Sequence, residues 1–512
     1  MTDVEATSWA AEVADLRERQ RIAAKMGGED AVQKQHDRGR QTVRERISQL
    51  FDPESFRETG SIAGRRDGSS FVPANTVCGR GTIDGRPVVV VGDDFTVRGG
   101  SVEITESGKT IYPEKLANEY RLPLVRLVES GGGSIKTLEA IGRTYVPANP
   151  GWDYLVSNLS TVPVVALAMG PCGGIAAARV SASHYSVMVR GTSQAFAGGP
   201  PLVARQGETI DKESLGGAAI QTRNGTVLDA VDSESEAFEQ ARRFLSYLPS
   251  SVYELPPRAE LTDDPRRRDE SLLSAIPRNR RKPHAIRPII ETIVDKGSFF
   301  EMGKNWGRSI VTGLARLDGW PVAVLSTDAR YGAAFTADGA RKTEWFADLA
   351  ETFHLPVVHL VDQPGLPIGS EAERAGTMRY AVRATSAVYQ ASVPWCSIII
   401  RRAFGVGGAA HSNAERVQIR YAWPSAEWGS LPNEGGVDAA FRSHIENSDD
   451  PAAERARLIA EMDAVRSPML TAEDFGVEEI IDPRDTRALL CEFANLAAPL
   501  RRPGRSSWGF RG

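Results

Sequence analysis

Short apolar runs alternate with amphipathic segments along most of the chain from about residue 77 onward. In the first half, the runs at 88–91, 123–128 and 163–168 are rich in valine and leucine, a composition typical of buried strands. The segment 102–120, between the first two runs, has a helical pattern. Strands that alternate with helices predict an α/β architecture.

The second half of the chain repeats this order of elements. Apolar runs at 322–325, 355–361 and 393–400 predict strands, and 340–352 predicts the intervening helix. Gly85 and Gly319 lie 234 positions apart, Pro123 and Pro356 233, Pro163 and Pro394 231, and Gly173 and Gly407 234. Four landmarks in one order and at nearly one spacing predict an internal duplication.

Two segments stand outside this repeated pattern. Residues 3–50 are polar and helical in character, and Thr42 with Glu45 forms a capping box that opens a short helix. A linker carries seven prolines between 249 and 288 and a basic run at 278–282 that we interpret as a solvated surface segment. The expected domains are therefore an arm at 1–50, a first domain at 51–250, the linker at 251–288 and a second domain at 289–512.

The composition and net charge give no support to several classes of protein. The chain has 512 residues, 41% of them apolar and 25% charged, with a formal net charge of −5. The charge gives no reason to expect a nucleic-acid or membrane partner, and no apolar run has the length of a membrane span. The N-terminus lacks the features of a signal peptide, so we expect a cytoplasmic protein.

Cysteine and histidine spacing does not predict a metal site. The four cysteines, Cys78, Cys172, Cys396 and Cys491, form no CxxC pair and are expected to be reduced thiols. The seven histidines show no ligand spacing. We expect His184 and His359 to be structural, and His411, which follows a glycine cluster, is a candidate for a role at a site.

A glycine cluster follows a strongly apolar strand in each half of the chain. If a helix begins at such a turn, its first amides point outward and form an oxyanion hole, which stabilises an enolate or a tetrahedral species. The candidate positions are Gly173, Gly174 and Ile175 in the first half, and Gly405, Val406 and Gly407 in the second. The alternative is that these are tight turns required only for packing.

A series of short motifs makes a family resemblance specific. They are Arg44-Glu-Arg46, Asp93-Asp-Phe-Thr96, Gly99-Gly-Ser101, Met169-Gly-Pro-Cys172, Leu215-Gly-Gly-Ala218, Tyr247-Leu-Pro249, Val361-Asp-Gln-Pro-Gly365, Tyr421-Ala-Trp-Pro424 and Ile481-Asp-Pro483. In this order they resemble the β (carboxyltransferase) subunits of propionyl-CoA and methylcrotonyl-CoA carboxylases, from about residue 36 to 500. The resemblance implies two tandem crotonase-like, ββα-superhelix domains.

The resemblance also implies an activity and its partners. The chain is expected to transfer a carboxyl group from carboxybiotin to the α or vinylogous carbon of an acyl-CoA. Biotin is expected on a separate carrier protein, because Lys25 lies in a helical arm rather than on a hairpin tip, and biotin carboxylase is expected to be another chain as well. The assembly implied is a hexamer, with each site between the first half of one subunit and the second half of another.

The residues implied for this chemistry belong mainly to the two glycine clusters. Backbone amides of Gly174 and Ile175 are expected to hold the thioester carbonyl, and those of Val406 and Gly407 the ureido carbonyl of biotin. The implied substrate-binding positions are Gly131, Gly132, Gly173, Gly405, Gly408 and Ala409. No metal is expected in the chemistry.

Several departures from the family pattern leave the acyl group open. Ile175 crowds the acyl side, Gln221 replaces a common histidine, Ala409 stands where propionyl-type members carry aspartate, and the run from Trp428 to Pro432 is unusual. A decarboxylase or transcarboxylase subunit and a non-catalytic partner in a carboxylase complex remain alternatives. A biotin-free hydratase is a further alternative, which requires a base such as Glu129. Asp362 is assigned either to the site or to capping its own turn.

Overall fold

Two compact units make up the chain in the computed structural model, which describes residues 8–67, 70–101, 107–133, 135, 139, 142–144, 146 and 148–510. Unit 1 comprises Met1–Glu254 together with Ser507–Gly512, and unit 2 comprises Leu255–Ser506. The final residues of the chain therefore group with unit 1, where the Phe510 ring packs on His184 at 4.6 Å between centroids.

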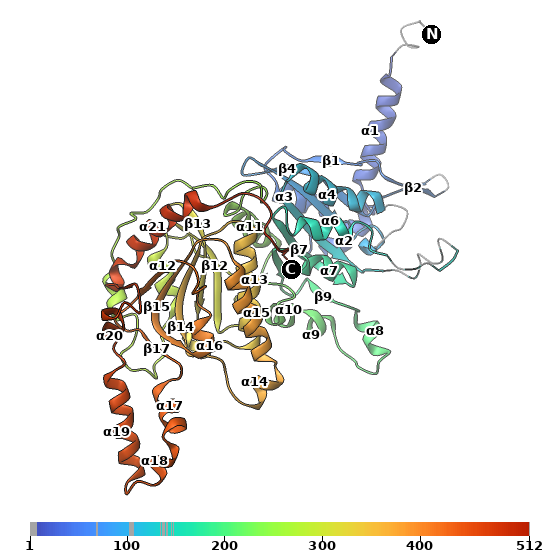
Figure 1. The fold of residues 1–512 in the computed structure, drawn as a ribbon. Helices are drawn as coiled ribbons and strands as arrows, with labels where there is room; N and C mark the ends of the chain where they lie inside the picture. Colours follow the sequence, from blue (N-terminus) through green and yellow to red (C-terminus); the bar gives the residue numbers. More distant parts are fainter. Residues whose placement is uncertain are drawn as a thin grey trace. The chain divides into compact units, whose positions relative to one another are not determined.

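Unit 1 is built on an eight-stranded sheet with the order β1-β4-β5-β6-β7-β8-β10, and β9 pairs with β7 (Figure 1). The strands are β1 (Arg57–Thr59), β4 (Thr76–Ile83), β5 (Arg86–Asp93), β6 (Leu124–Ser130), β7 (Val164–Gly173), β8 (Tyr185–Val189), β9 (Gln194–Phe196) and β10 (Asp229–Val231). A separate hairpin joins β2 (Gly64–Asp67) to β3 (Ser70–Pro73). The first strands pair antiparallel and those from β5 to β8 run parallel, so the parallel strands are joined by crossover connections.

Helices precede and surround this sheet. They are α1 (Ala10–Ala24), α2 (Glu29–His36), α3 (Val43–Leu50), α4 (Ser107–Tyr120), α6 (Trp152–Asn158), α7 (Ile175–Ser181), α8 (Pro200–Ala204), α9 (Lys212–Gly216), α10 (Ala218–Asn224) and α11 (Glu234–Ser246). The capping box expected at α3 is confirmed: the Glu45 N–H donates to Thr42 Oγ1, and Glu45 accepts from the Thr42 N–H. The helix expected from about residue 102 is present as α4; residues 102–106 lie outside the described part.

Unit 2 repeats the same sheet, in the order β11-β12-β13-β14-β15-β16-β18, with β17 paired to β15. The strands are β11 (Phe300–Met302), β12 (Ile310–Leu317), β13 (Trp320–Thr327), β14 (Val357–Gln363), β15 (Trp395–Phe404), β16 (Ile419–Ala422), β17 (Glu427–Gly429) and β18 (Glu479–Ile480). Each sheet has its off-path strand at the same place. The internal duplication predicted from the spacing of landmarks is therefore confirmed.

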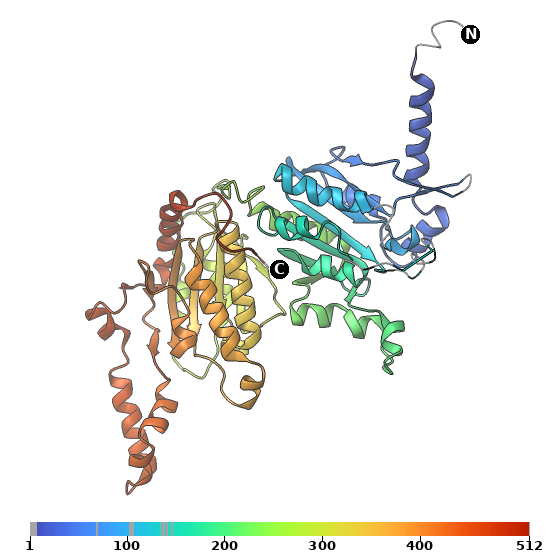
Figure 2. The same ribbon diagram turned by 45° about the vertical axis from the view of Figure 1, so that its right-hand side comes forward.

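Helices cover both faces of the second sheet (Figure 1). They are α12 (Ile286–Ile293), α13 (Ala337–Thr352), α14 (Ser370–Arg374), α15 (Thr377–Gln390), α16 (Gly405–Ala409), α17 (Asn433–Ala440), α18 (Arg442–Glu446), α19 (Pro451–Ala464), α20 (Pro468–Glu473) and α21 (Thr486–Ala497). In both ribbon views α13 and α15 lie side by side, and α17 to α19 project away from the sheet (Figure 2).

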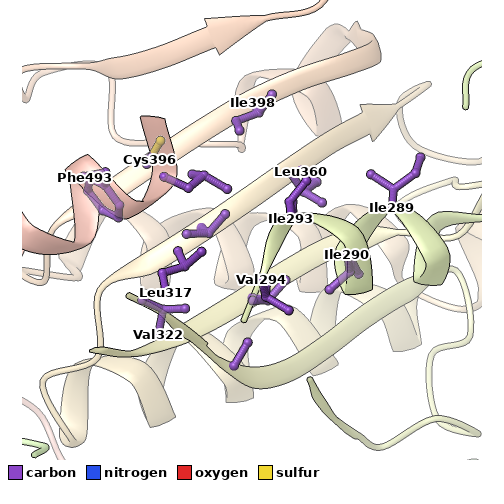
Figure 3. Packing of buried hydrophobic residues seen from close by; sticks show 14 of the residues in the cluster. Ile289, Ile290, Ile293, Val294, Leu317, Val322, Leu360, Cys396, Ile398 and Phe493 are labelled. Carbon is purple, nitrogen blue, oxygen red and sulfur yellow. The ribbon is translucent and has the colours of Figure 1, made fainter. Parts of the chain in front are cut away.

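The core of unit 2 lies between the sheet and the pair α12 and α21 (Figure 3). Ile289, Ile290 and Ile293 on α12 recur at helical spacing and meet strand residues that recur at every second position, such as Cys396 and Ile398. These side chains are almost fully excluded from water, and burial of each contributes about 1.5–3 kcal/mol. The packed core holds the ends of β14 and β15 in place, where the glycine turns occur.

Candidate active site

The glycine turns of the two units share a positive φ at one glycine. Gly174 follows β7 and precedes α7 with φ of +56°, and Gly405 follows the last residue of β15 with φ of +57°. Both turns occur where the strand pairs with the short off-path strand, with Gly173 opposite Phe196 and Phe404 opposite Gly429. Gly405 is thus the counterpart of Gly174, which corrects the sequence-based match of Gly173 with Gly407.

Within the first turn, one backbone N–H has a hydrogen-bond acceptor in the sheet and the next N–H lies at the start of a helix. The Gly174 N–H donates to the Phe196 carbonyl at 2.9 Å and so extends the pairing of β7 with β9. The next residue, Ile175, is the first of α7, and a helix supplies no carbonyl acceptor for the N–H groups of its own first turn. Val406 occupies the equivalent position in unit 2, and its side chain is 53% exposed. Ile175 and Val406 therefore carry the amides that correspond between the two units.

A second glycine loop supports each turn from the neighbouring strand. Gly132, after β6, has φ of +84°, and its N–H donates to Ser130 Oγ at 3.0 Å. Gly365, after β14, has φ of +111°, and its N–H donates to Gln363 Oε1 at 3.1 Å. The side chain two residues earlier thus fixes both loops, a feature that sequence analysis missed although the spacing from the strand end is equal.

The supporting loops touch the glycine turns backbone to backbone. A Cβ on Gly132 would lie 2.6 Å from the Gly173 carbonyl oxygen, and one on Gly173 would lie 2.9 Å from the Gly131 oxygen. In unit 2, a Cβ on Gly407 would lie 3.2 Å from the Gly365 backbone. These contacts explain why glycine occupies the positions, and they bring the predicted residues Gly131, Gly132 and Gly173 together within unit 1.

Helix α16 lies directly against the end of its own strand. A Cβ on Gly408 would lie 2.4 Å from the carbonyl carbon of Ala403, a separation that side chains do not tolerate. Gly407 and Gly408 are buried, whereas Val406 and Ala409 are exposed on the opposite face of the helix. The predicted residues of unit 2 are therefore adjacent on α16, with the side chains of residues 406 and 409 facing outward.

His411 ties the end of α16 to the sheet. Its Nδ1–H donates to the Gly408 carbonyl at 2.6 Å, and its own carbonyl accepts from His359 Nδ1, Trp395 Nε1 and Ser397 Oγ at 2.9–3.1 Å. Burial lowers the pKa of His411, and burial lowers that of His359 to about 3, so both rings are neutral at physiological pH.

The structural role expected of His359 is confirmed, and the same holds for His184, whose two ring nitrogens bond to the Val164 N–H and the Leu159 carbonyl.

Buried carboxylates at the strand ends are paired with arginine. Glu129, in β6, is fully buried and accepts from Arg40 Nη1 and Arg46 Nη1, each at 2.5 Å, and from Gln35 Nε2 at 2.7 Å. Asp362, 233 positions later, is fully buried and accepts from Arg402 Nε at 2.6 Å. Glu129 is fully buried and hydrogen-bonded to three side chains, so it is not placed to act on a substrate as the base that a hydratase needs. The capping role considered for Asp362 is performed by Gln363.

Gln221, at the position where the family commonly carries histidine, is also a structural residue. Its side chain is buried, and Nε2 donates to the Ala195 carbonyl at 2.5 Å. Ala195 precedes Phe196, whose carbonyl accepts from Gly174. Gln221 therefore helps to hold β9 beside the first glycine turn.

Cys172, which immediately precedes the first glycine turn, has the properties of a packing residue. It and the other three cysteines are free and buried. Desolvation raises the pKa of the Cys172 thiol, as it raises that of Cys78 to about 11 and that of Cys491 to about 12.

We expect iodoacetamide at pH 8 to label none of the four cysteines in the folded protein and all four in denaturant, measured by intact mass. Rapid labelling of Cys172 without denaturant would contradict this assignment.

The described residues contain no cluster of three or more histidine, cysteine, aspartate or glutamate side chains arranged to hold a metal ion. Nor does any described helix combine the length and apolar character that crossing a bilayer requires.

Comparisons with known proteins show similarity over nearly the whole length of the chain. The chain matches the model of the Carboxyl transferase domain over residues 34–508. It is 33% identical over 491 residues to the propionyl-CoA carboxylase carboxyltransferase subunit of Haloferax mediterranei, covering 92% of this chain and 93% of that protein. It is 32% identical over 490 residues to the methylmalonyl-CoA decarboxylase subunit alpha of Veillonella parvula, with 92% and 93% covered.

A solved structure agrees with the fold. The crystal structure of transcarboxylase 12S, a hexamer with methylmalonyl-coenzyme A and methylmalonic acid bound, superposes with a TM-score of 0.88 at 29% identity over 99% of both chains. The fold predicted from the resemblance, two tandem crotonase-like domains, is confirmed. With its duplicated sheets, its paired glycine turns and these matches over nearly its whole length, the chain belongs to the carboxyl transferase domain family of enzymes.

Proposed function

We propose that this chain transfers a carboxyl group from carboxybiotin, attached to a separate carrier protein, to the α or vinylogous carbon of an acyl-CoA. The observation that carries the proposal is the repeated glycine turn, with φ of +56° at Gly174 and +57° at Gly405. Carboxyl transfer requires two carbonyl oxygens to be stabilised as enolates, one on each substrate. Two equivalent sets of backbone donors match that requirement.

Unit 1 is proposed to hold the acyl-CoA. The Ile175 N–H is the proposed donor to the thioester carbonyl, because the Gly174 N–H already donates to Phe196. Gly174 is assigned to the site through its positive φ, which sets the direction of the next amide. Gly131, Gly132 and Gly173 are assigned to substrate binding, since glycine lets a thioester approach the main chain closely.

Unit 2 is proposed to hold the ureido group of biotin. The amides of Val406 and Gly407 are the proposed donors, and Gly405, Gly408 and Ala409 are proposed to line the site. The exposed face of α16 fits a flat ring system, because only glycine and small or aliphatic side chains occupy the helix. When bound, carboxybiotin supplies the carboxyl group, and the chain's residues orient its carbonyl and stabilise the charge that develops there.

The acyl group is proposed to be short or medium in length. Ile175 places a branched side chain at the first turn, and Ala409 leaves the outer face of α16 uncharged. The assembly is proposed to be a hexamer that works with biotin carboxylase and a biotin carboxyl carrier protein, each site drawing on the first domain of one subunit and the second domain of another. The domain boundaries at 50, 250 and 288 and a cytoplasmic location remain predictions.

The test is a reconstitution with labelled bicarbonate. The purified chain is combined with biotin carboxylase, a biotinylated carrier and ATP, and a panel of acyl-CoA thioesters is assayed for acid-stable label. We expect transfer to at least one thioester that depends on the biotinylated carrier. Equal turnover with an unbiotinylated carrier would overturn the proposal.

A decarboxylase or transcarboxylase subunit is the second candidate, favoured by the 32% identity to the Veillonella decarboxylase subunit. It predicts that the chain carboxylates carrier-bound biotin from methylmalonyl-CoA when ATP and bicarbonate are omitted. If this direction proceeds faster than the ATP-dependent one under matched concentrations, the second candidate replaces the first.

A further inference from the structure

A pocket of about 700 Å³ opens in unit 2 beyond the end of α16, and it has no part in the proposed transfer. Its walls come from the end of α15, the start of β15, the segment that follows His411 and the chain after α21. This volume falls within the range of about 300–1,000 Å³ that is usual for small-molecule sites.

Basic residues dominate the charged part of the lining. Arg416, Arg501 and Arg502 line the pocket, and no aspartate or glutamate is among its lining residues. None of these three guanidinium groups forms an ion pair with a carboxylate in the described part of the chain. The pocket therefore has an uncompensated positive charge, which favours an anion.

Arg501 is held by a ring contact and by two backbone carbonyls although it lacks a counter-ion. Its side chain is 92% buried, stacks 4.9 Å from the Trp320 ring centroid, and donates through Nε and Nη1 to the carbonyls of Ala498 and Pro256. Nη2 makes no hydrogen bond to the described residues. Burial lowers the pKa of Arg501, with no neighbouring acid to oppose the effect. A pre-positioned guanidinium with an open donor is suited to a carboxylate.

The Arg416 guanidinium also donates its hydrogen bonds to backbone carbonyls, which carry no net charge. Its Nη1 donates to the carbonyls of Ala391 and Val393, and its Nη2 donates to that of Ser392. Glu351, which lies behind this wall, accepts from the amides of Ser392 and Val393 and from the Ser392 hydroxyl. The Glu351 carboxylate is therefore hydrogen-bonded to residues that form this wall, and it does not line the pocket.

The remaining lining is mostly apolar. Trp395, Phe493, Val388 and Ile419 provide a hydrophobic interior, and Leu500 and Val417 are exposed. A ligand that fits both parts of the lining needs an anionic group and a hydrocarbon body.

We propose that this pocket binds an amphipathic carboxylate, with the anionic group at Arg501 and Arg502 and the hydrocarbon chain against Trp395 and Phe493. The site is distinct from the glycine turns and does not depend on the proposed carboxyl transfer. The charge and the apolar lining act together, so neither a neutral amphipath nor a small inorganic anion satisfies both.

The probes are octanoate, octanamide and inorganic phosphate, each titrated into the full-length assembled protein by calorimetry. We expect octanoate to bind once per chain. Octanamide, which has the same hydrocarbon body without the charge, and phosphate, which has charge without the body, are each expected to bind about tenfold more weakly or less. Equal binding of octanoate and octanamide overturns the proposal.

Substitutions of the arginines that line the pocket test whether octanoate binds there. Arg502 is exposed and without an ion pair, so Arg502→Glu leaves the fold intact and is expected to weaken octanoate binding about tenfold or more. Arg442→Glu, at an exposed arginine of α18, is the matched control and is expected to change nothing. Arg501→Gln is a second variant, checked by its melting temperature. Octanoate affinity that is unchanged in Arg502→Glu overturns the proposal whatever the outcome for Arg501.

Discussion

We expect Gly408→Ala to reduce carboxyl transfer by about 10²–10³-fold, the loss that follows removal of one oxyanion donor. The new Cβ would lie 2.4 Å from the Ala403 carbonyl carbon and 3.0 Å from its Cα, so α16 must move away from β15. That movement displaces the amides of Val406 and Gly407, which we assign to the biotin carbonyl. The measurements are the rate of the complete reaction and the rate of carboxybiotin decarboxylation without acyl-CoA.

Both rates are expected to fall, while the affinity for the acyl-CoA, assigned to unit 1, stays unchanged. Gly435→Ala in α17 is the matched control, because a Cβ there meets nothing within 4 Å. A normal decarboxylation rate in a folded Gly408→Ala protein would show that α16 does not hold biotin.

We expect Arg46→Met to lower the free energy of unfolding by about 3–5 kcal/mol, the usual cost of removing one partner from a buried ion pair. Arg46 is 1% exposed and donates to Glu129 at 2.5 Å, to Glu234 at 2.7 and 2.8 Å, and to the Met169 carbonyl at 3.1 Å. Without the Arg46 guanidinium, buried Glu234 loses its arginine partner and buried Glu129 loses one of its two. Denaturant titration at one protein concentration measures the change.

Arg44→Met, on the same helix, is the matched control for this prediction. Arg44 pairs with Glu58 in a partly exposed site, where an ion pair contributes about 0–1 kcal/mol. Adding Glu234→Gln to Arg46→Met is expected to recover part of the loss, because one uncompensated charge is removed. Equal losses for the two arginine variants would show that burial of the network contributes little.

Local sequence patterns were sufficient to predict the elements and the duplication. The valine-rich run at 88–91 lies in β5, and the run at 393–400 begins two residues before β15 and covers its first six residues, because a strand buried on both faces is apolar at most positions. Thr42 and Glu45 are three residues apart, so their capping box depends on a single helical turn. The motif resemblance, spread over nearly the whole chain, correctly indicated the family and the fold.

The partners of the candidate site residues could not be predicted from these patterns. Glu129 looked available as a base, yet Arg40 and Arg46, 89 and 83 positions earlier in the chain, neutralise it. Nothing in the local sequence encodes such long-range pairs, because they form only when α3 and the segment before it pack against the sheet. The same limit applied to His411, whose contacts with His359, Trp395 and Ser397 reach two strands, β14 and β15.

The sequence by itself determined where the chain turns: a glycine cluster follows an apolar strand in each half, and only glycine permits the close backbone contacts found there. Only the tertiary structure decided which glycine in each cluster takes a positive φ and which amide in the first turn is used in strand pairing. The physical reason is strand pairing. β9 and β17 join the sheet from elsewhere in the chain, and their register selects Gly174 and Gly405 as the residues at which the backbone must turn.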